Sequence, residues 1–141
     1  MVDKNNLVKL ENKLPRPKPS AAFDRIFVRN LVLECQIGAY EEEKGVKQRV
    51  RFSVEMSVYP SRRRSQDDVN SAVNYDLIVD AIKSAVSNGH VHLVETLAER
   101  IAAKCLSHRR AAKVRICIEK LDRLEGASLG VEIERSKFPP A

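Results

Sequence analysis

The chain predicts an α+β domain in which a four-stranded antiparallel sheet carries two helices on one face. Four separate stretches alternate between apolar and polar residues, which is the period of a half-buried strand. Two stretches between the second and third strands instead repeat their apolar residues at helical spacing. The order is therefore ββααββ, and both helices can cover the same face of one sheet.

Length and composition favour a single soluble domain. The chain has 141 residues, of which 43% are hydrophobic and 31% charged, which suits one domain with a moderate core. No apolar run is long enough to span a membrane, and residues 1–10 lack the hydrophobic segment of a secretory signal. Three cysteines without a C-x-x-C pair indicate neither a disulfide framework nor a zinc site. We expect a cytoplasmic protein with no membrane partner.

Residues 1–22 predict a flexible, basic extension in front of the domain. Five basic and two acidic residues there carry half of the chain's net charge of +6, and Pro15, Pro17 and Pro19 disfavour regular structure. The remaining charge is interspersed with acids and accompanied by no aromatic stacking platform, so we expect solvated surface and no nucleic-acid partner. The domain is expected over residues 23–137, followed by a short tail over residues 138–141.

The first two strands are expected on either side of a polar connection. Within residues 23–37 the apolar alternation changes parity at Arg29 and Asn30, which predicts a bulge or bend. Gly38 closes this run, and residues 39–45 connect it to the second strand. That strand has the cleanest alternation in the chain, with Val50, Phe52, Val54, Met56 and Val58 on one face.

Two amphipathic helices and a second pair of strands follow. Asn74 is a favourable cap for the first helix, and Asn88-Gly89 ends it. The second helix is expected from about Leu93 to Ser107. A third strand includes residues 114–118, a loop is expected over residues 121–127, and a fourth strand ends near Lys137. The sheet would keep two edge strands and one uncovered face, so we expect the protein to self-associate.

Four polar residues lie where connections meet these elements: Glu43, Tyr75, Glu95 and Lys120. Glu95 falls in the first turn of the second helix, where free N–H groups and the helix dipole favour negative charge. It could stabilise the helix or bind a ligand that carries N–H groups. The others could be a solvated turn acid, an aromatic residue packed at a helix start and a strand-end lysine. Alternatively, a lysine near a glutamate and a tyrosine could transfer a proton.

His90 and His92 form an H-x-H pair that could bind a metal on a strand. No third ligand stands in a recognisable motif. We therefore expect no metal site.

Seven short motifs occur in an order that resembles dihydroneopterin aldolases of folate synthesis. The resemblance covers about residues 23–136. The motifs are Asp24-Arg25-Ile26, Ile-Gly-Ala-Tyr-Glu-Glu-Glu at 37–43, Asp67-Asp68-Val69, Val73-Asn74-Tyr75, Leu-Val-Glu-Thr-Leu-Ala-Glu-Arg at 93–100, Val-Arg-Ile-Cys-Ile-Glu-Lys at 114–120 and Gly-Val-Glu-Ile at 130–133.

The resemblance implies the tunnelling fold and a role for each polar position. In that family, tetrameric barrels, often stacked as octamers, hold active sites between neighbouring subunits. Glu95, with the backbone at Val94, resembles the group that anchors the amino group and ring N–H of the pterin. Lys120 resembles the proton donor or acceptor, and Glu43 a glutamate near the substrate side chain. Tyr75 resembles a tyrosine contributed by the neighbouring subunit.

The implied reaction is a retro-aldol cleavage of 7,8-dihydroneopterin that needs no cofactor, metal or Schiff base. Two positions depart from many aldolases of the family: Leu121 replaces a proline after the lysine, and Ile37 replaces a histidine before the glycine. The Glu-Glu-Glu run and the Lys-Leu pair also resemble dihydroneopterin triphosphate epimerases, so 2′-epimerisation is the alternative. Other classes left open are a module that binds nucleic acid or acidic partners, suggested by the net charge of +6 and the basic tail, and a pterin-binding oligomer without catalysis.

Overall fold

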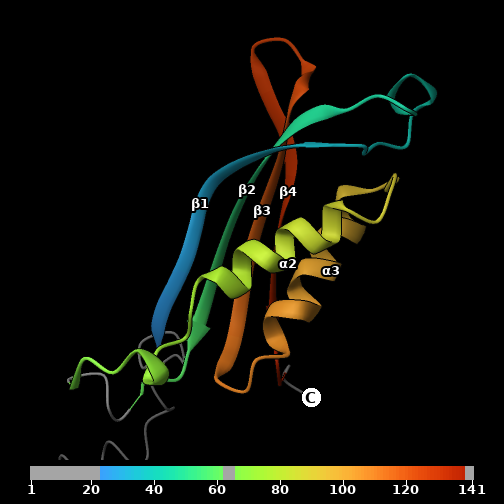
Figure 1. The fold of residues 1–141 in the computed structure, drawn as a ribbon. Coiled ribbons are helices and arrows are strands. Elements are labelled where there is room, and N and C mark those ends of the chain that lie inside the picture. The colour runs from blue at the N-terminus through green and yellow to red at the C-terminus, as the bar shows by residue number, and fades with distance from the viewer. Residues whose placement is uncertain (1–22, 62–65, 139–141) are drawn as a thin grey trace, which may run out of the picture.

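The computed structural model describes residues 23–61 and 66–138 (Figure 1). The predicted extension over residues 1–22, the basic residues Arg62 to Arg64 and the end of the tail at 139–141 lie outside the described residues. Among the residues described, no helix is long and apolar enough to cross a membrane.

Four antiparallel strands form one sheet in the order β1-β2-β3-β4, and two helices cover one of its faces (Figure 1). The predicted ββααββ order is confirmed. Two short 3₁₀ turns, η2 and η4, lie in the connections. The elements are β1 (Asp24–Cys35), η2 (Glu41–Glu43), β2 (Gln48–Val58), η4 (Val69–Ser71), α2 (Asp76–Val86), α3 (Val94–Leu106), β3 (Ala111–Leu124) and β4 (Ala127–Ser136).

The core lies between the helices and the two central strands. The alternating apolar residues of β2 are each at most 2% exposed, and they pack with the inward residues of β3 and the apolar stripes of both helices. The opposite parity of β2 instead forms cross-strand ion pairs. Arg51 reaches Glu119 at 2.8 Å and Arg49 reaches Asp122 at 2.7 Å. One face of the sheet is therefore apolar and covered, while the other is polar.

The expected change of parity in the first strand is present as an irregularity in β1. The register between β1 and β2 shifts between Val28 and Leu31, and Asn30 has a φ of 60°. Asparagine tolerates this left-handed conformation better than most residues. The backbone N–H of Asn30 donates to the hydroxyl of Ser53 at 3.1 Å, which satisfies a donor that the strand ladder has lost.

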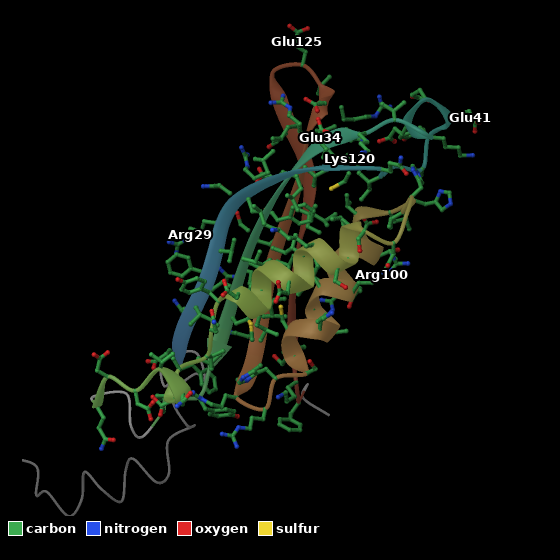
Figure 2. All side chains as sticks on the ribbon, viewed as in Figure 1. Arg29, Glu34, Glu41, Arg100, Lys120 and Glu125 are labelled. Atoms are coloured by element: carbon green, nitrogen blue, oxygen red, sulfur yellow. The ribbon has the colours of Figure 1, made fainter. Side chains whose placement is uncertain are left out.

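The prediction of a loop over residues 121–127 was wrong. β3 continues to Leu124 and β4 begins at Ala127, so the connection is the two-residue turn Glu125-Gly126, with φ of 82° at the glycine. A register shift between Lys120 and Leu124 interrupts the alternation there. This end of the hairpin, with Glu125 at its tip, projects beyond the helices (Figure 2). Without a helix to pack against, its strands do not need an apolar face.

Candidate active site

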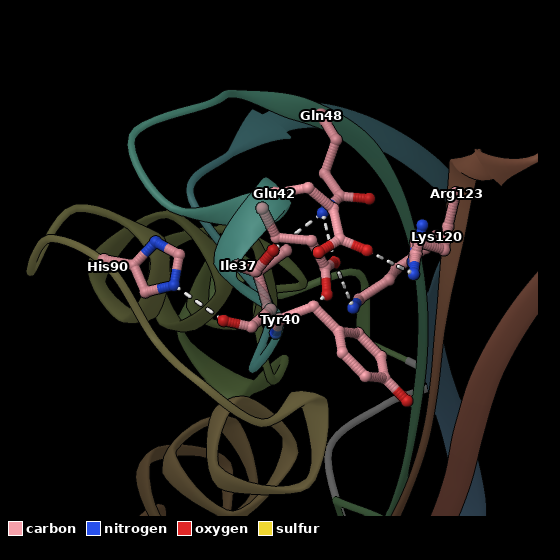
Figure 3. A network of polar contacts seen from close by, with 9 residues as sticks. Ile37, Tyr40, Glu42, Gln48, His90, Lys120 and Arg123 are labelled. Carbon is pink, nitrogen blue, oxygen red and sulfur yellow. Dashed lines mark hydrogen bonds and ion pairs between the residues drawn. The ribbon is translucent and has the colours of Figure 1, made fainter.

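Glu43 and Lys120 are brought into contact although 77 positions separate them in the sequence. The ammonium nitrogen of Lys120 lies 2.7 Å from Oε2 of Glu43 (Figure 3). Lys120 faces the core side of β3, opposite Val50 of β2, at the last regular position before the register shift. Glu43 ends η2 and is only 4% exposed. The pair therefore lies at the boundary between the core and the turn end of the β3–β4 hairpin.

Two further groups hold the Glu43 carboxylate. The amide Nε2 of Gln48 donates to Oε2 at 2.9 Å and also to the carbonyl of Ile37 at 2.7 Å. The backbone N–H of Tyr40 donates to Oε1 at 3.4 Å. Burial alone raises the pKa of Glu43, but the hydrogen bonds from Lys120, Gln48 and Tyr40, with the charge of Lys120, outweigh it and lower the pKa. The carboxylate is thus ionised and holds the lysine ammonium in a fixed orientation.

Gly38 makes room for this carboxylate. A Cβ at this position would lie 2.1 Å from Cδ of Glu43. The backbone φ of 137° is also one that residues other than glycine rarely adopt. Any larger residue would therefore displace Glu43. The sequence marked Gly38 only as the end of the first strand.

A short backbone junction joins the loop before α3, the helix that carries Glu95, to the segment that follows β1. Ile37 and Val91 form an isolated parallel bridge, with Gly38 N–H donating to Val91 O at 2.9 Å and Val91 N–H donating to Gln36 O at 3.1 Å. α3 begins three residues after Val91. Its first turn contains the half-buried Val94 and the exposed Glu95.

The Glu95 carboxylate has no hydrogen-bond or ion-pair partner within residues 23–61 and 66–138. It lies in the first turn of α3, where the helix dipole and unpaired backbone N–H groups stabilise its charge. A ligand with two adjacent N–H groups could therefore bind there, and the neighbouring backbone could accept or donate further hydrogen bonds.

Tyr75 is not brought together with the other three residues. It precedes α2, is 62% exposed, and lies at the opposite end of the helix layer from the start of α3 (Figure 1). The 11 residues of α2 alone span roughly 16 Å. Within one chain, Glu43 and Lys120 are thus in contact, Glu95 lies on the helix that the backbone junction ties to their loop, and Tyr75 stands at the far end of α2.

Sequence reasoning missed several residues around the ion pair. Gln48 has the same parity as the buried residues of β2, so a polar residue on the apolar face was an available signal. Arg123 donates to Glu42 at 3.1 Å and lies 5.0 Å from the ring centre of Tyr40 (Figure 3). Sequence gave no signal for Arg123, because the bulge that directs it toward this loop was not predicted.

The two histidines of the H-x-H pair face each other edge to face, with ring centres 5.4 Å apart. His90 Nε2 contacts the carbonyl of Gly38. Across the described ranges, no group of three His, Cys, Asp or Glu side chains is arranged to hold a metal ion.

Comparison with known proteins connects this geometry to one family. A family model for dihydroneopterin aldolase matches residues 26–134. The dihydroneopterin aldolase of Streptomyces coelicolor is 30% identical, over 71% of this chain and 84% of that protein. The dihydroneopterin triphosphate 2′-epimerase of Escherichia coli is 28% identical, over 72% of this chain and 85% of that protein.

Solved structures agree in fold. A Burkholderia dihydroneopterin aldolase bound to guanine is 32% identical with a TM-score of 0.76, covering 85% of this chain and 96% of that one. The Escherichia coli dihydroneopterin aldolase in complex with neopterin is 31% identical with a TM-score of 0.73, covering 80% of this chain and 99% of that one. The shared architecture is the tunnelling fold, and the chain belongs to the dihydroneopterin aldolase family.

Proposed function

We propose that the protein is a dihydroneopterin aldolase, which cleaves 7,8-dihydroneopterin into 6-hydroxymethyl-7,8-dihydropterin and glycolaldehyde. The observation that carries the proposal is the contact of Lys120 with the buried carboxylate of Glu43, 2.7 Å apart, in a loop that the Ile37–Val91 bridge ties to the segment leading into α3 and Glu95. A pterin carries an amino group beside a ring N–H, which matches a carboxylate acceptor. Its hydroxylated side chain would then extend toward the lysine.

In the proposed mechanism, Glu95 and the backbone at Val94 hold the pterin ring. Lys120 donates or accepts protons at the hydroxylated side chain of the substrate. Loss of the 2′-hydroxyl proton lets the C1′–C2′ bond break, which releases glycolaldehyde. The bonding electrons form C1′=C6 and move to N5, which takes up a proton. Protonation of C1′ and loss of the N5 proton then restore C6=N5 in the product. The site therefore supplies positioning and proton transfer.

The proposed chemistry uses neither a metal nor a Schiff base. The C6=N5 imine of the substrate already accepts the electrons that a Schiff base would otherwise accept. Lys120, held in an ion pair with Glu43, carries a proton on its nitrogen and is a poor nucleophile in that state. Treatment with borohydride during turnover should therefore leave the mass of the protein unchanged, and a chelator should leave the rate unchanged.

We further propose that the complete site forms between two copies of the chain, with Tyr75 supplied by the neighbour. Tyr75 is exposed and far from Lys120 within one chain, and β1 and β4 each pair on one side only among the described strands. A tetramer or octamer would satisfy both features, because unpaired edges favour association with another copy.

The deciding experiment is to incubate the purified protein with 7,8-dihydroneopterin, oxidise the mixture and separate the fluorescent pterins by chromatography. The hydroxymethyl product is expected. Heat-denatured protein serves as the control for spontaneous cleavage. An unchanged substrate peak would reject the proposal for this substrate.

The alternative, 2′-epimerisation, is favoured by one feature, the leucine at position 121 after Lys120, together with the similarity to the epimerase of Escherichia coli. Both reactions share the cleavage step. An epimerase would reclose the bond on the other face of the aldehyde before C1′ is protonated. Monapterin as the sole product, from dihydroneopterin or its triphosphate, would identify that activity.

A further inference from the structure

The loop before α3 carries His90, which the proposed chemistry does not use. Its Nε2 lies 2.8 Å from the carbonyl oxygen of Gly38 (Figure 3). Because a carbonyl oxygen only accepts, Nε2 carries a proton and donates it. Nδ1 of the same ring is buried and has no hydrogen-bond partner within the described part of the chain. The bond to Gly38 is therefore the polar contact that orients this ring.

This bond reinforces a junction that is otherwise very short. The parallel bridge between Ile37 and Val91 supplies two backbone hydrogen bonds, of 2.9 and 3.1 Å. A single bridge does not extend into a strand pair on either side, so its backbone hydrogen bonds are few, although the Ile37 and Val91 side chains are buried. The hydrogen bond from the His90 side chain to the Gly38 carbonyl is a third connection between the two segments.

Each side of the junction leads to one half of the proposed site. On one side, Gly38 touches the Glu43 carboxylate, since a Cβ there would lie 2.1 Å from its carbon atom. A shift of Gly38 would move Glu43 and with it the 2.7 Å contact to Lys120. On the other side, a few residues separate His90 from the first turn of α3, which contains Glu95.

We propose that His90 is a positioning residue, whose hydrogen bond to Gly38 fixes the separation between Glu95 and the Glu43–Lys120 pair. This inference rests on the proposed function, because it assigns the pterin ring to Glu95 and proton transfer to Lys120. A rigid bicyclic substrate bound at one point reaches the other only if this separation matches its length. Loosening the junction should therefore lower turnover more than it lowers ring binding or stability.

Three substitutions test the bond. In His90→Gln the amide nitrogen can occupy nearly the position of Nε2. In His90→Asn the amide nitrogen corresponds to Nδ1 and does not reach the Gly38 carbonyl. His90→Phe keeps a ring without a donor. We expect kcat to fall roughly 10- to 100-fold in the Phe and Asn variants, the cost of small misplacements in a site. The Gln variant should retain most of the activity, and all three should bind neopterin with nearly unchanged affinity.

His92→Ala is the matched control, because it removes the ring that faces His90 but no hydrogen bond made within residues 23–61 and 66–138, and it should keep wild-type kcat. Unchanged kcat in His90→Phe would overturn the inference. So would a Gln variant no better than the Asn variant, since the effect would then come from packing of the ring.

Amide hydrogen exchange keeps this inference separate from the proposed function. The N–H groups of Gly38 and Val91 should exchange faster in His90→Phe than in His90→Gln, whether or not the protein turns over a pterin. If wild-type protein does not cleave dihydroneopterin, the proposed function fails, and exchange still decides whether His90 fixes the junction. Equal exchange in the two variants would overturn that role.

Discussion

At the scale of single residues, the site depends on a glutamate whose charge is balanced by its neighbours. Glu43 is buried, and such a carboxylate is stable only when hydrogen bonds and an opposite charge compensate for lost hydration. Gln48, Tyr40 and Lys120 supply that compensation. The same contacts that stabilise the carboxylate also fix the lysine, so structural and chemical roles overlap at these positions and must be separated by experiment.

Lys120→Arg and Lys120→Ala separate them. Arginine keeps the positive charge beside Glu43 but does not release a proton near neutral pH. Both variants should lose roughly 100- to 10,000-fold in kcat, the usual range for a missing acid–base group. Neopterin binding, followed by fluorescence titration, should persist. Only Lys120→Ala should also lower the melting temperature, because it leaves the Glu43 carboxylate buried without its cation. Full turnover in either variant would refute the proton-transfer role.

The lowered pKa of Glu43 predicts how stability depends on pH. Because the folded pKa lies below the unfolded value of about 4.3, the ionised carboxylate contributes stability that is fully present above that value. The contribution is lost as pH falls through the folded pKa. Urea unfolding should therefore show wild-type protein more stable than Glu43→Gln at pH 7, with a difference that shrinks below about pH 4.3.

Glu41→Gln provides the control for this pH series. Glu41 lies in the same 3₁₀ turn, but its side chain is 86% exposed and pairs with Lys44 at the surface. Its substitution should change stability little at any pH, because exposed ion pairs contribute little. A constant difference between wild type and Glu43→Gln from pH 7 to acid would contradict the assigned electrostatic role.

At the scale of elements, the connection between β1 and β2 shapes the site. Gly38, η2 and Gln48 together wrap around the Glu43 side chain, and the bridge to Val91 joins this connection to α3. Sequence predicted a polar turn here. Its detailed path depends on a positive φ at Gly38 and on a glutamine that points inward.

Gly38→Ala tests that path against a matched glycine in the same connection. Gly45 also has a positive φ, of 72°, but a Cβ there would meet no atom within 4 Å. Gly45→Ala should cost only the backbone strain, about 1 kcal/mol. Gly38→Ala adds a direct clash with Glu43, so it should lower thermal stability further and reduce kcat. Equal melting temperatures and equal rates for the two variants would show that Gly38 does not shape the site around Glu43.

At the scale of the whole molecule, the two helices place Tyr75 and Glu95 at opposite ends of the helix layer. Tyr75 precedes α2, whereas Glu95 lies in the first turn of α3, at the other end of the helix layer (Figure 1). A single chain therefore presents two partial surfaces. Oligomerisation through the sheet edges would let each surface complete the other, and light scattering should then give four or eight times the chain mass of 15.9 kDa.

Mixing two inactive variants tests whether sites are shared between copies. Lys120→Ala and Tyr75→Phe should each have low activity alone. If Tyr75 comes from the neighbouring copy, mixed oligomers contain some sites with both wild-type residues, about a quarter of them for random association. Co-expressed chains should recover activity on that scale. Activity no higher than the average of the separate variants would mean that both residues act within one copy of the chain, or that Tyr75 is not part of the site.

The sequence by itself determined the order of elements, the buried face of each strand and helix, and the family. The order and the buried faces follow from local periodicity, because burial of one face imposes a period of two in strands and of 3.6 in helices. The family followed from the resemblance of seven short motifs, taken in order. It also marked the four polar positions, although only as residues at the ends of elements.

Only the tertiary structure decided which of them meet. The contact between Glu43 and Lys120 depends on the β2–β3 register and on Gly38, and neither leaves a periodic signal. The same holds for the hairpin that extends past the helices and for the bond from His90 to Gly38. Such contacts join residues that are distant in the chain, so their geometry is set by how whole elements pack and not by any local pattern.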